Sequence, residues 1–168
     1  SIHTMNLIGG SNPVFGLNTL GGTISIETKN GFNFNGTNVE LYNATAHDRN
    51  VFTFETGGND GTVGYYGTVQ HFDEQGWRDA SPSDALNFFG ALSYRDEYTT
   101  SLDLNVNYAN TDPIGNGAIP IEFANLDYDG IFTSPDQTLN EVLMLQAQGA
   151  HWFNDERQIS GNVFYRRT

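Results

Sequence analysis

Hydrophobic and polar residues alternate along most of the chain from Thr37 onward. The clearest stretch is 99–109, where apolar positions 102, 104, 106 and 108 alternate with Ser, Asp and Asn. Successive side chains of a strand point to opposite faces, so this pattern predicts a strand with one apolar and one polar face. The same alternation, less regular, predicts further strands around residues 37–47, 51–57, 62–72, 86–95 and 157–166.

Residues 139–151 show a mixed pattern. Leu143, Leu145 and Ala147 share one side of an extended chain, but Val142 and Met144 fall on the side that also carries polar residues. An apolar run of this kind is compatible with a strand and with a helix, because periodicity alone does not separate them. We favour a strand and leave the helix open.

The first 31 residues differ from the rest. They are apolar and rich in glycine, and only Thr23–Thr28 alternates clearly, with Ile24 and Ile26 opposite Ser25 and Glu27. The chain therefore divides into a first region at 1–31 and a strand-rich region at 36–168.

The connections between the expected strands are sorted by length. After a first turn they alternate short, long, short, long and short, at 48–50, 58–61, 73–85, 96–97, 111–138 and 154–156. Tight turns on one rim and long loops on the other are typical of outer-membrane β-barrels. A strand of ~11 residues, at ~3.3 Å per residue and tilted by ~40°, rises ~27 Å and matches the apolar band of such barrels.

Composition supports an all-β fold. The 168 residues include 19 Gly, 12 Phe and 8 Tyr, which suit turns and pleated sheets. A net charge of -13 argues against nucleic acid as a partner, because a phosphate backbone requires a basic surface. There is no cysteine, and no apolar run approaches the ~18 residues of a membrane helix.

Catalytic and metal-binding patterns are absent from the sequence. The four histidines are dispersed, and the run from Asp127 to Gly130 lacks the further ligands of a calcium loop. No nucleophile elbow, Walker loop or dinucleotide fingerprint occurs. We therefore expect no enzyme activity, no metal site and no cofactor.

About seven strands are too few for an isolated barrel that also contains the first region. Single-chain bacterial barrels have an even number of strands, and a barrel near eight strands is filled by its own side chains. An open sheet would leave unpaired strand edges in lipid. We therefore expect the sequence to be an internal piece of a longer chain, and Ser1 to be a cut end.

A string in the first region resembles the end of the plug domain of TonB-dependent receptors. It runs from Gly10 to Ile26 and includes Asn12, Pro13, Phe15, Gly16, Gly21 and Gly22, followed by Thr28 and Lys29. The later segments Gly76–Asp79, Tyr94–Arg95, Ile131–Asp136 and Tyr165–Arg167 are similar to the same family in order and spacing. The resemblance covers nearly the whole chain.

The resemblance implies a fold, a location and an activity. The fold would be the C-terminal part of a plug at 1–31, followed at 36–168 by antiparallel strands of a partial transmembrane β-barrel in the outer membrane of a Gram-negative bacterium. The activity would be active import of a scarce solute such as a ferric siderophore or another iron chelate. Its partners would be that small molecule, outer-membrane lipid, and TonB, which contacts a plug segment that this sequence does not contain.

Candidate site residues lie in the long loops and on the expected polar faces. Loops carry the outward contacts of such barrels, so Trp77, Arg78, Ile131 and Phe132 are the candidate ligand contacts. The carboxylates of Glu40 and Glu55 face the expected lumen, where they either hold the plug or are simply solvated.

Two other functions remain open. A passive porin-like barrel would not require the plug string. A secreted β-sandwich that binds carbohydrate would stack the apolar faces of its strands on one another and would stay in solution without detergent.

Overall fold

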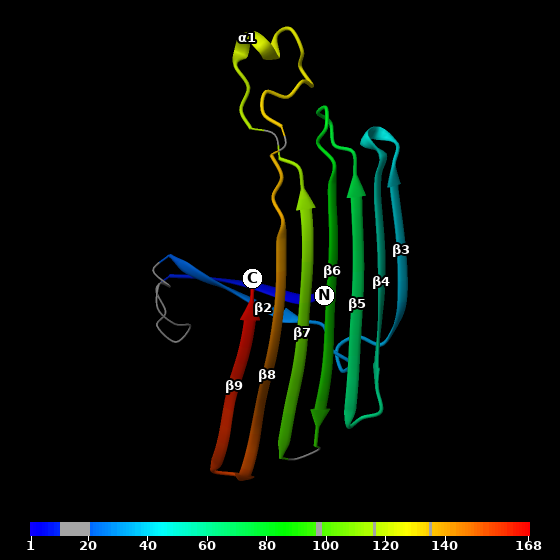
Figure 1. The fold of residues 1–168 in the computed structure, drawn as a ribbon. Coiled ribbons are helices and arrows are strands. Elements are labelled where there is room, and N and C mark those ends of the chain that lie inside the picture. Colours follow the sequence, from blue (N-terminus) through cyan, green and yellow to red (C-terminus); the bar gives the residue numbers. More distant parts are fainter. Residues whose placement is uncertain (11–20, 97–98, 116, 135) are drawn as a thin grey trace.

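The computed structural model describes residues 1–10, 21–96, 99–115, 117–134 and 136–168, and almost all of the regular structure is β (Figure 1). Strands β1 (Ile2–Gly9) and β2 (Gly22–Thr28) form a two-stranded sheet. The following strands form one seven-stranded sheet: β3 (Gly36–Ala44), β4 (Arg49–Asn59), β5 (Val63–Glu74), β6 (Ser83–Arg95), β7 (Thr100–Pro113), β8 (Asn140–Asn154) and β9 (Arg157–Arg167). The prediction of an all-β chain with about seven antiparallel strands is confirmed.

The seven-stranded sheet is a simple meander. Each strand pairs with the next strand along the chain, and every pair is antiparallel. Strands β3 and β9 form its two edges, so the sheet is open, and the described residues contain no closed barrel.

One side of this sheet is apolar from edge to edge. The register between β3 and β8 is continuous, so apolar residues of neighbouring strands meet in rows across the sheet. One row contains Val39, Phe54, Val69, Phe88, Tyr108 and Leu143. This apolar side is open to solvent: Leu41 is 78% exposed, Leu104 42% and Val163 68%.

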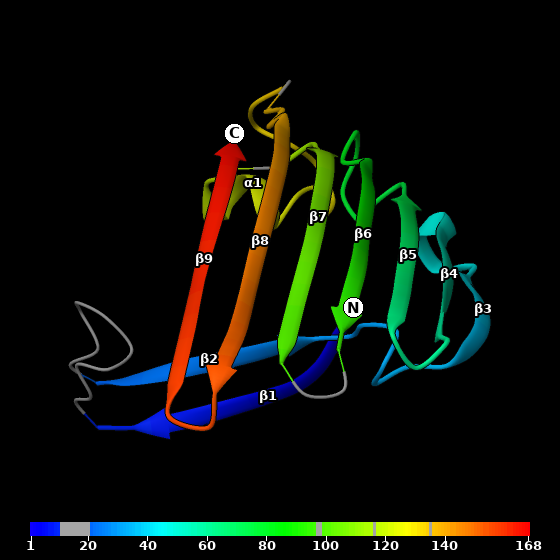
Figure 2. The same ribbon diagram turned by 90° about the horizontal axis from the view of Figure 1, so that it is seen from below.

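The other side is mainly polar, and the N-terminal region lies against it. Figure 2 shows the β1–β2 hairpin crossing below this polar side, toward which the sheet curves at β3. The buried residues Tyr66, Phe89 and Ala91 also lie on the polar side, where Phe34 packs against them. Phe89, which interrupts the polar alternation of its strand, is therefore explained by contact with the N-terminal region.

Residues 29–34, which we call the docking segment, bring the N-terminal region close to the sheet. Gly31 lies against the turn between β4 and β5, where an added Cβ would collide with the backbone of Gly58, Gly64 and Tyr65. The amide nitrogen Nδ2 of Asn59 donates a hydrogen bond to the carbonyl oxygen of Gly31 at 2.7 Å. Glycine is needed here because of the close approach of two backbones.

The connections are sorted by end, as expected. Residues 45–48, 75–82 and 114–139 connect strands at one end, the long-loop end. At the opposite end, the short-turn end, residues 60–62 connect β4 to β5 and residues 155–156 connect β8 to β9. Strand β6 ends there at Arg95, and β7 begins at Thr100. The expected turn at 96–97 falls partly on residue 97, outside the described residues. The loops at 73–85 and 111–138 are shorter than predicted, because strand pairing continues to Glu74 with Ser83 and to an isolated bridge between Ile114 and Gln137.

The strand favoured near residues 139–151 is confirmed, and two further elements were not expected. Residues 140–151 belong to strand β8, and the helix alternative fails because this stretch pairs with β7 on one edge and with β9 on the other. Strand β1 was not expected, since its residues alternate weakly, and it forms by pairing with β2. The short helix α1 (Ile121–Ala124) lies in the longest loop. No helix in the described ranges has the length and apolar character that a membrane crossing requires.

Replacement of Gly31 by alanine should displace the docking segment from the sheet. The new methyl group would meet backbone atoms that cannot move aside, so we expect a loss of ~1–3 kcal/mol in the free energy of unfolding. Faster hydrogen exchange at the amides of residues 32–34 would report the displacement. Gly67→Ala is the matched control, because a Cβ there meets no atom within 4 Å. Equal effects of the two substitutions would contradict the close contact.

Candidate functional site

An ion pair joins the docking segment to the polar side of the sheet. The Nζ of Lys29 lies 2.8 Å from Oε2 of Glu55, and both side chains are largely shielded, with 24% and 12% of their surfaces exposed. The hydroxyl of Tyr66 donates to the same Glu55 oxygen at 2.8 Å. Lys29 also lies over the ring of Phe34, 4.6 Å from its centroid. A shielded pair of this kind is screened by salt less than a surface pair.

A second contact involves Phe32 and a polar network on β6, β7 and β8. The guanidinium carbon of Arg95 lies 5.5 Å from the centroid of the Phe32 ring. Two hydrogen bonds of 2.7 and 2.9 Å join Arg95 to the carboxylate of Asp103, which also accepts from Ser93 at 2.6 Å and Gln148 at 3.3 Å. The docking segment is therefore held at two separate positions on the sheet.

Two grooves separate the rest of the N-terminal region from the polar side. The first, of about 400 Å³, lies between the end of β2 and strands β6–β8, where Asn105, Gln146 and Gln148 line it. The second, of about 450 Å³, lies beside Lys29 over strands β3–β7, where Glu40 and Gln70 line it. Phe89 and Asn107 line both grooves, so the two grooves lie side by side on the polar side of the sheet.

The two longest loops are bonded to each other at the long-loop end. The rings of Trp77 and Tyr128 lie 5.4 Å apart, tilted by 40°. Arg78 lies over Trp77 at 4.9 Å, and its Nη1 donates to the carbonyl oxygen of Gly117 at 3.0 Å. The backbone nitrogen of Asp79 donates to the carbonyl oxygen of Asp129 at 2.9 Å. These contacts place one exposed aromatic pair between the loops.

Two carboxylates, Asp127 and Asp129, flank Tyr128 in the longer loop. A hydrogen bond with Asp129, partial desolvation and the negative charges of Asp129 and Asp79 raise the pKa of Asp127 above its ordinary value. Asp127 also lies so close to Gly130 that a Cβ on this glycine would collide with it. The loop therefore places the carboxyl group of Asp127 within hydrogen-bonding reach of Asp129.

The predicted site residues fall into separate places. Trp77 and Arg78 lie in the bonded loops, whereas Ile131 and Phe132 lie further along the longer loop, with Phe132 63% exposed. Glu55 bonds to the docking segment, and Glu40 lines the second groove without belonging to that ion pair.

The predicted plug string is only partly described. Asn12, Pro13, Phe15 and Gly16 lie outside the described residues. Gly21 accepts a backbone hydrogen bond from Gly10 at 3.4 Å. Gly22 has a φ of 153°, and a Cβ there would lie 2.9 Å from the carbonyl oxygen of Ile8, so the start of β2 requires glycine.

The sequence did not lead us to predict the residues that contact Trp77 and Glu55. Tyr128 was not singled out, although an exposed aromatic residue between two aspartates in a long loop is a usable signal. Lys29 was noted only as the end of a motif. As one of the chain's seven Lys and Arg residues, beside a predicted carboxylate-lined lumen, it could have been proposed as an ion-pair partner.

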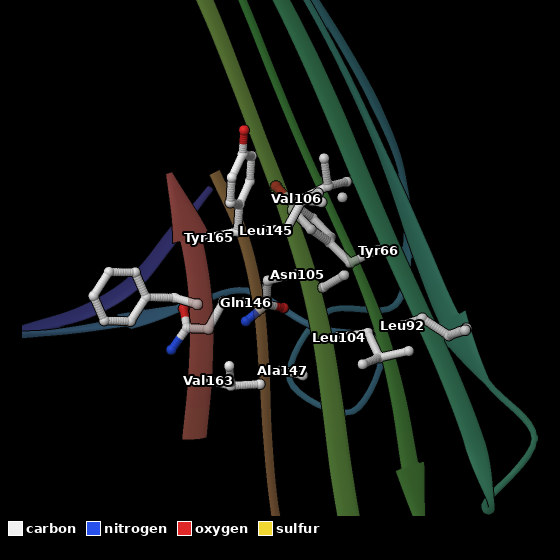
Figure 3. A pocket seen from close by; sticks show the side chains of 13 residues that line it. Tyr66, Leu92, Leu104, Asn105, Val106, Leu145, Gln146, Ala147, Val163 and Tyr165 are labelled. Atoms are coloured by element: carbon white, nitrogen blue, oxygen red, sulfur yellow. The ribbon is translucent and has the colours of Figure 1, made fainter. Parts of the chain in front are cut away.

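A shallow hollow also occurs on the apolar side. Figure 3 shows side chains that line it, including Leu92, Leu104, Leu145 and Val163. The hollow forms where Gly90 and Ala147 take positions that larger residues occupy elsewhere. Its lining matches the surrounding surface, so we regard it as part of the apolar side.

These places offer side chains that can bind a ligand. In the described part of the chain, no group of three or more His, Asp or Glu side chains is positioned to hold a metal ion. The loops offer aromatic faces and carboxylates, and the grooves offer side-chain amides. No family model matches the chain, and neither a curated protein nor a solved structure shows significant similarity to it.

The Lys29–Glu55 pair should be measurable by a double-mutant cycle. Lys29→Met would leave a shielded carboxylate without its cation, and Glu55→Gln would leave a shielded cation, so each should destabilise the fold. The double variant should cost less than the sum of the two, with a coupling of ~1–3 kcal/mol in the free energy of unfolding. A coupling near zero, from denaturant titrations, would mean that the pair does not hold the docking segment.

Acid should stabilise the folded form of the longer loop. Because folding holds Asp127 beside Asp129 and raises the pKa of Asp127, the folded loop binds more protons than the unfolded loop just above the ordinary pKa of aspartate, ~3.9. The stabilisation is complete below that value and is lost as the pH rises through the raised pKa. Carboxyl carbon NMR should show the raised pKa, and Asp129→Asn should return it toward the ordinary value. An unchanged titration of Asp127 in Asp129→Asn would contradict the contact between the two side chains.

Proposed function

We propose that this chain forms part of a transmembrane β-barrel and plug of a TonB-dependent type of outer-membrane transporter. In this arrangement the apolar side of the seven-stranded sheet meets lipid, and the polar side lines a lumen that contains the N-terminal region. The transporter imports a scarce solute from the long-loop end, with energy supplied through TonB.

The observation that carries this proposal is the opposite character of the two sides of the sheet. A water-soluble sheet protein covers its apolar side and solvates its polar side. Here the apolar side is exposed, and the N-terminal region lies on the polar side, where it is held by the Lys29–Glu55 pair. A membrane barrel with a plug requires both features.

The β-sandwich alternative receives less support. It needs a second sheet on the apolar side, whereas the only other sheet of the described chain lies on the polar side. The porin-like alternative accounts for the apolar side but gives no reason for a segment anchored at Glu55 and Arg95. The open edges at β3 and β9 would be satisfied by further strands of the barrel.

The two ends of the sheet also fit this proposal. The long-loop end carries the aromatic pair Trp77–Tyr128 and would face the exterior, while the short-turn end would face the periplasm. The resemblance implies a ferric siderophore or another iron chelate as the solute. The side chains of the loops and grooves favour a solute of a different chemical class.

Replacement of Leu104 by arginine should block membrane assembly. Its side chain points to the apolar side, where arginine costs ~2–4 kcal/mol at mid-depth of a bilayer. The neighbouring Asn105→Arg is the matched control, because its side chain points to the polar side and should allow assembly. Heat-modifiable migration and resistance to protease in outer-membrane fractions measure the outcome. Normal assembly of Leu104→Arg would show that this side does not meet lipid.

A further inference from the structure

We infer that the solute recognised by this chain is a neutral oligosaccharide. The inference rests on the proposed transport function and narrows its solute to one chemical class. It follows from four features: the side chains of the grooves, the pairing of their charges, the charge of the long-loop end and the aromatic pair between the long loops.

The polar side presents neutral side-chain amides to both grooves. Asn105, Gln146 and Gln148 line the first groove, and Asn87 and Gln70 line the second. Each amide offers two donors and one acceptor oxygen, and each sugar hydroxyl is both a donor and an acceptor. A row of amides can therefore exchange hydrogen bonds with successive hydroxyl groups along an oligosaccharide.

The cationic side chains that line these grooves are already neutralised. Lys29 is paired with Glu55, and Arg95 is held by two hydrogen bonds to Asp103. Glu40 and Glu27 also line the grooves and add negative charge. An anionic metal chelate would thus meet the negative charge of Glu27 and Glu40, while the two cationic side chains of the lining are already paired.

The charge of the long-loop end points the same way. The connections and adjoining strand ends at this end, residues 45–50, 73–84 and 112–141, hold eleven of the chain's twenty Asp and Glu but two of its seven Lys and Arg. The Nε of Arg49 lies 2.6 Å from Oε2 of Glu74. Arg78 lies over the ring of Trp77 and donates a hydrogen bond to Gly117. A field of this sign lowers the local concentration of anions.

The aromatic pair supplies a surface for the apolar faces of sugar rings. Trp77 is 49% exposed and Tyr128 75%, so both rings retain free surface although they pack against each other. The backbone hydrogen bond from Asp79 to Asp129 and the bond from Arg78 to Gly117 fix the rings before any solute arrives. The nearby carboxylates can accept hydrogen bonds from hydroxyl groups at the ring edges.

An organic cation would use these groups less completely. The carboxylates and aromatic faces would attract it. An ammonium group, however, has only donors, so the donor hydrogens of the groove amides would remain without partners. The amides are matched by a solute that both donates and accepts.

Calorimetric titration of outer-membrane vesicles that carry the full-length chain would test the inference. The probes are the neutral hexasaccharides maltohexaose, xylohexaose and chitohexaose, the anionic chelate ferric citrate and the polyamine spermine. We expect at least one hexasaccharide to bind, with an affinity that is the same at low and high salt, because no ion pair forms. Trp77→Ala should weaken this binding about tenfold by removing one ring surface. Trp152→Ala, which changes the tryptophan at the short-turn end, should leave it unchanged.

The outcomes separate this inference from the transport proposal. Binding of ferric citrate or spermine without binding of a hexasaccharide would overturn the inference and leave the transporter in place. Failure of all five probes to bind to vesicles that contain the assembled chain would also overturn it. Recovery of the wild-type chain in the soluble fraction, without lipid, would instead overturn the transport proposal itself.

Discussion

A continuous apolar surface on one side of a sheet is stable only where something other than water covers it. Exposure to water costs ~25 cal/mol for each Å² of apolar area, so the side formed by residues such as Leu104 and Val163 needs a cover. The described chain provides none, because its second sheet lies on the opposite side. The proposed lipid cover is consistent with three other features: the polar side, the docking segment and the sorting of the loops by length.

The docking segment concentrates the contacts between the N-terminal region and the sheet. Lys29, Gly31 and Phe32 contact the sheet through an ion pair, a backbone contact and an arginine–aromatic contact. The β1–β2 hairpin instead faces the sheet across grooves. One part of the N-terminal region is therefore fixed, while the other leaves open space along the polar side.

The strands could be predicted because each face of a pleated strand is exposed to a single environment. The alternation at Leu102–Tyr108 follows from this directly, and the break at Phe89 comes from a segment more than fifty residues away. Strand β8 was ambiguous because both Leu143 and Met144 are apolar, and pairing on two edges decides the outcome. The Lys29–Glu55 and Trp77–Tyr128 contacts depend on how loops and segments pack, which no local pattern encodes.

The position of Gly31 also constrains the order in which the chain can assemble. Its partners, Gly58 and Gly64, lie at the ends of β4 and β5 beside the first turn at the short-turn end, so this contact joins segments that are close in sequence. Contacts close in sequence form with a small loss of chain entropy. The N-terminal region can therefore attach to β4 and β5 before the later strands of the sheet pair with one another.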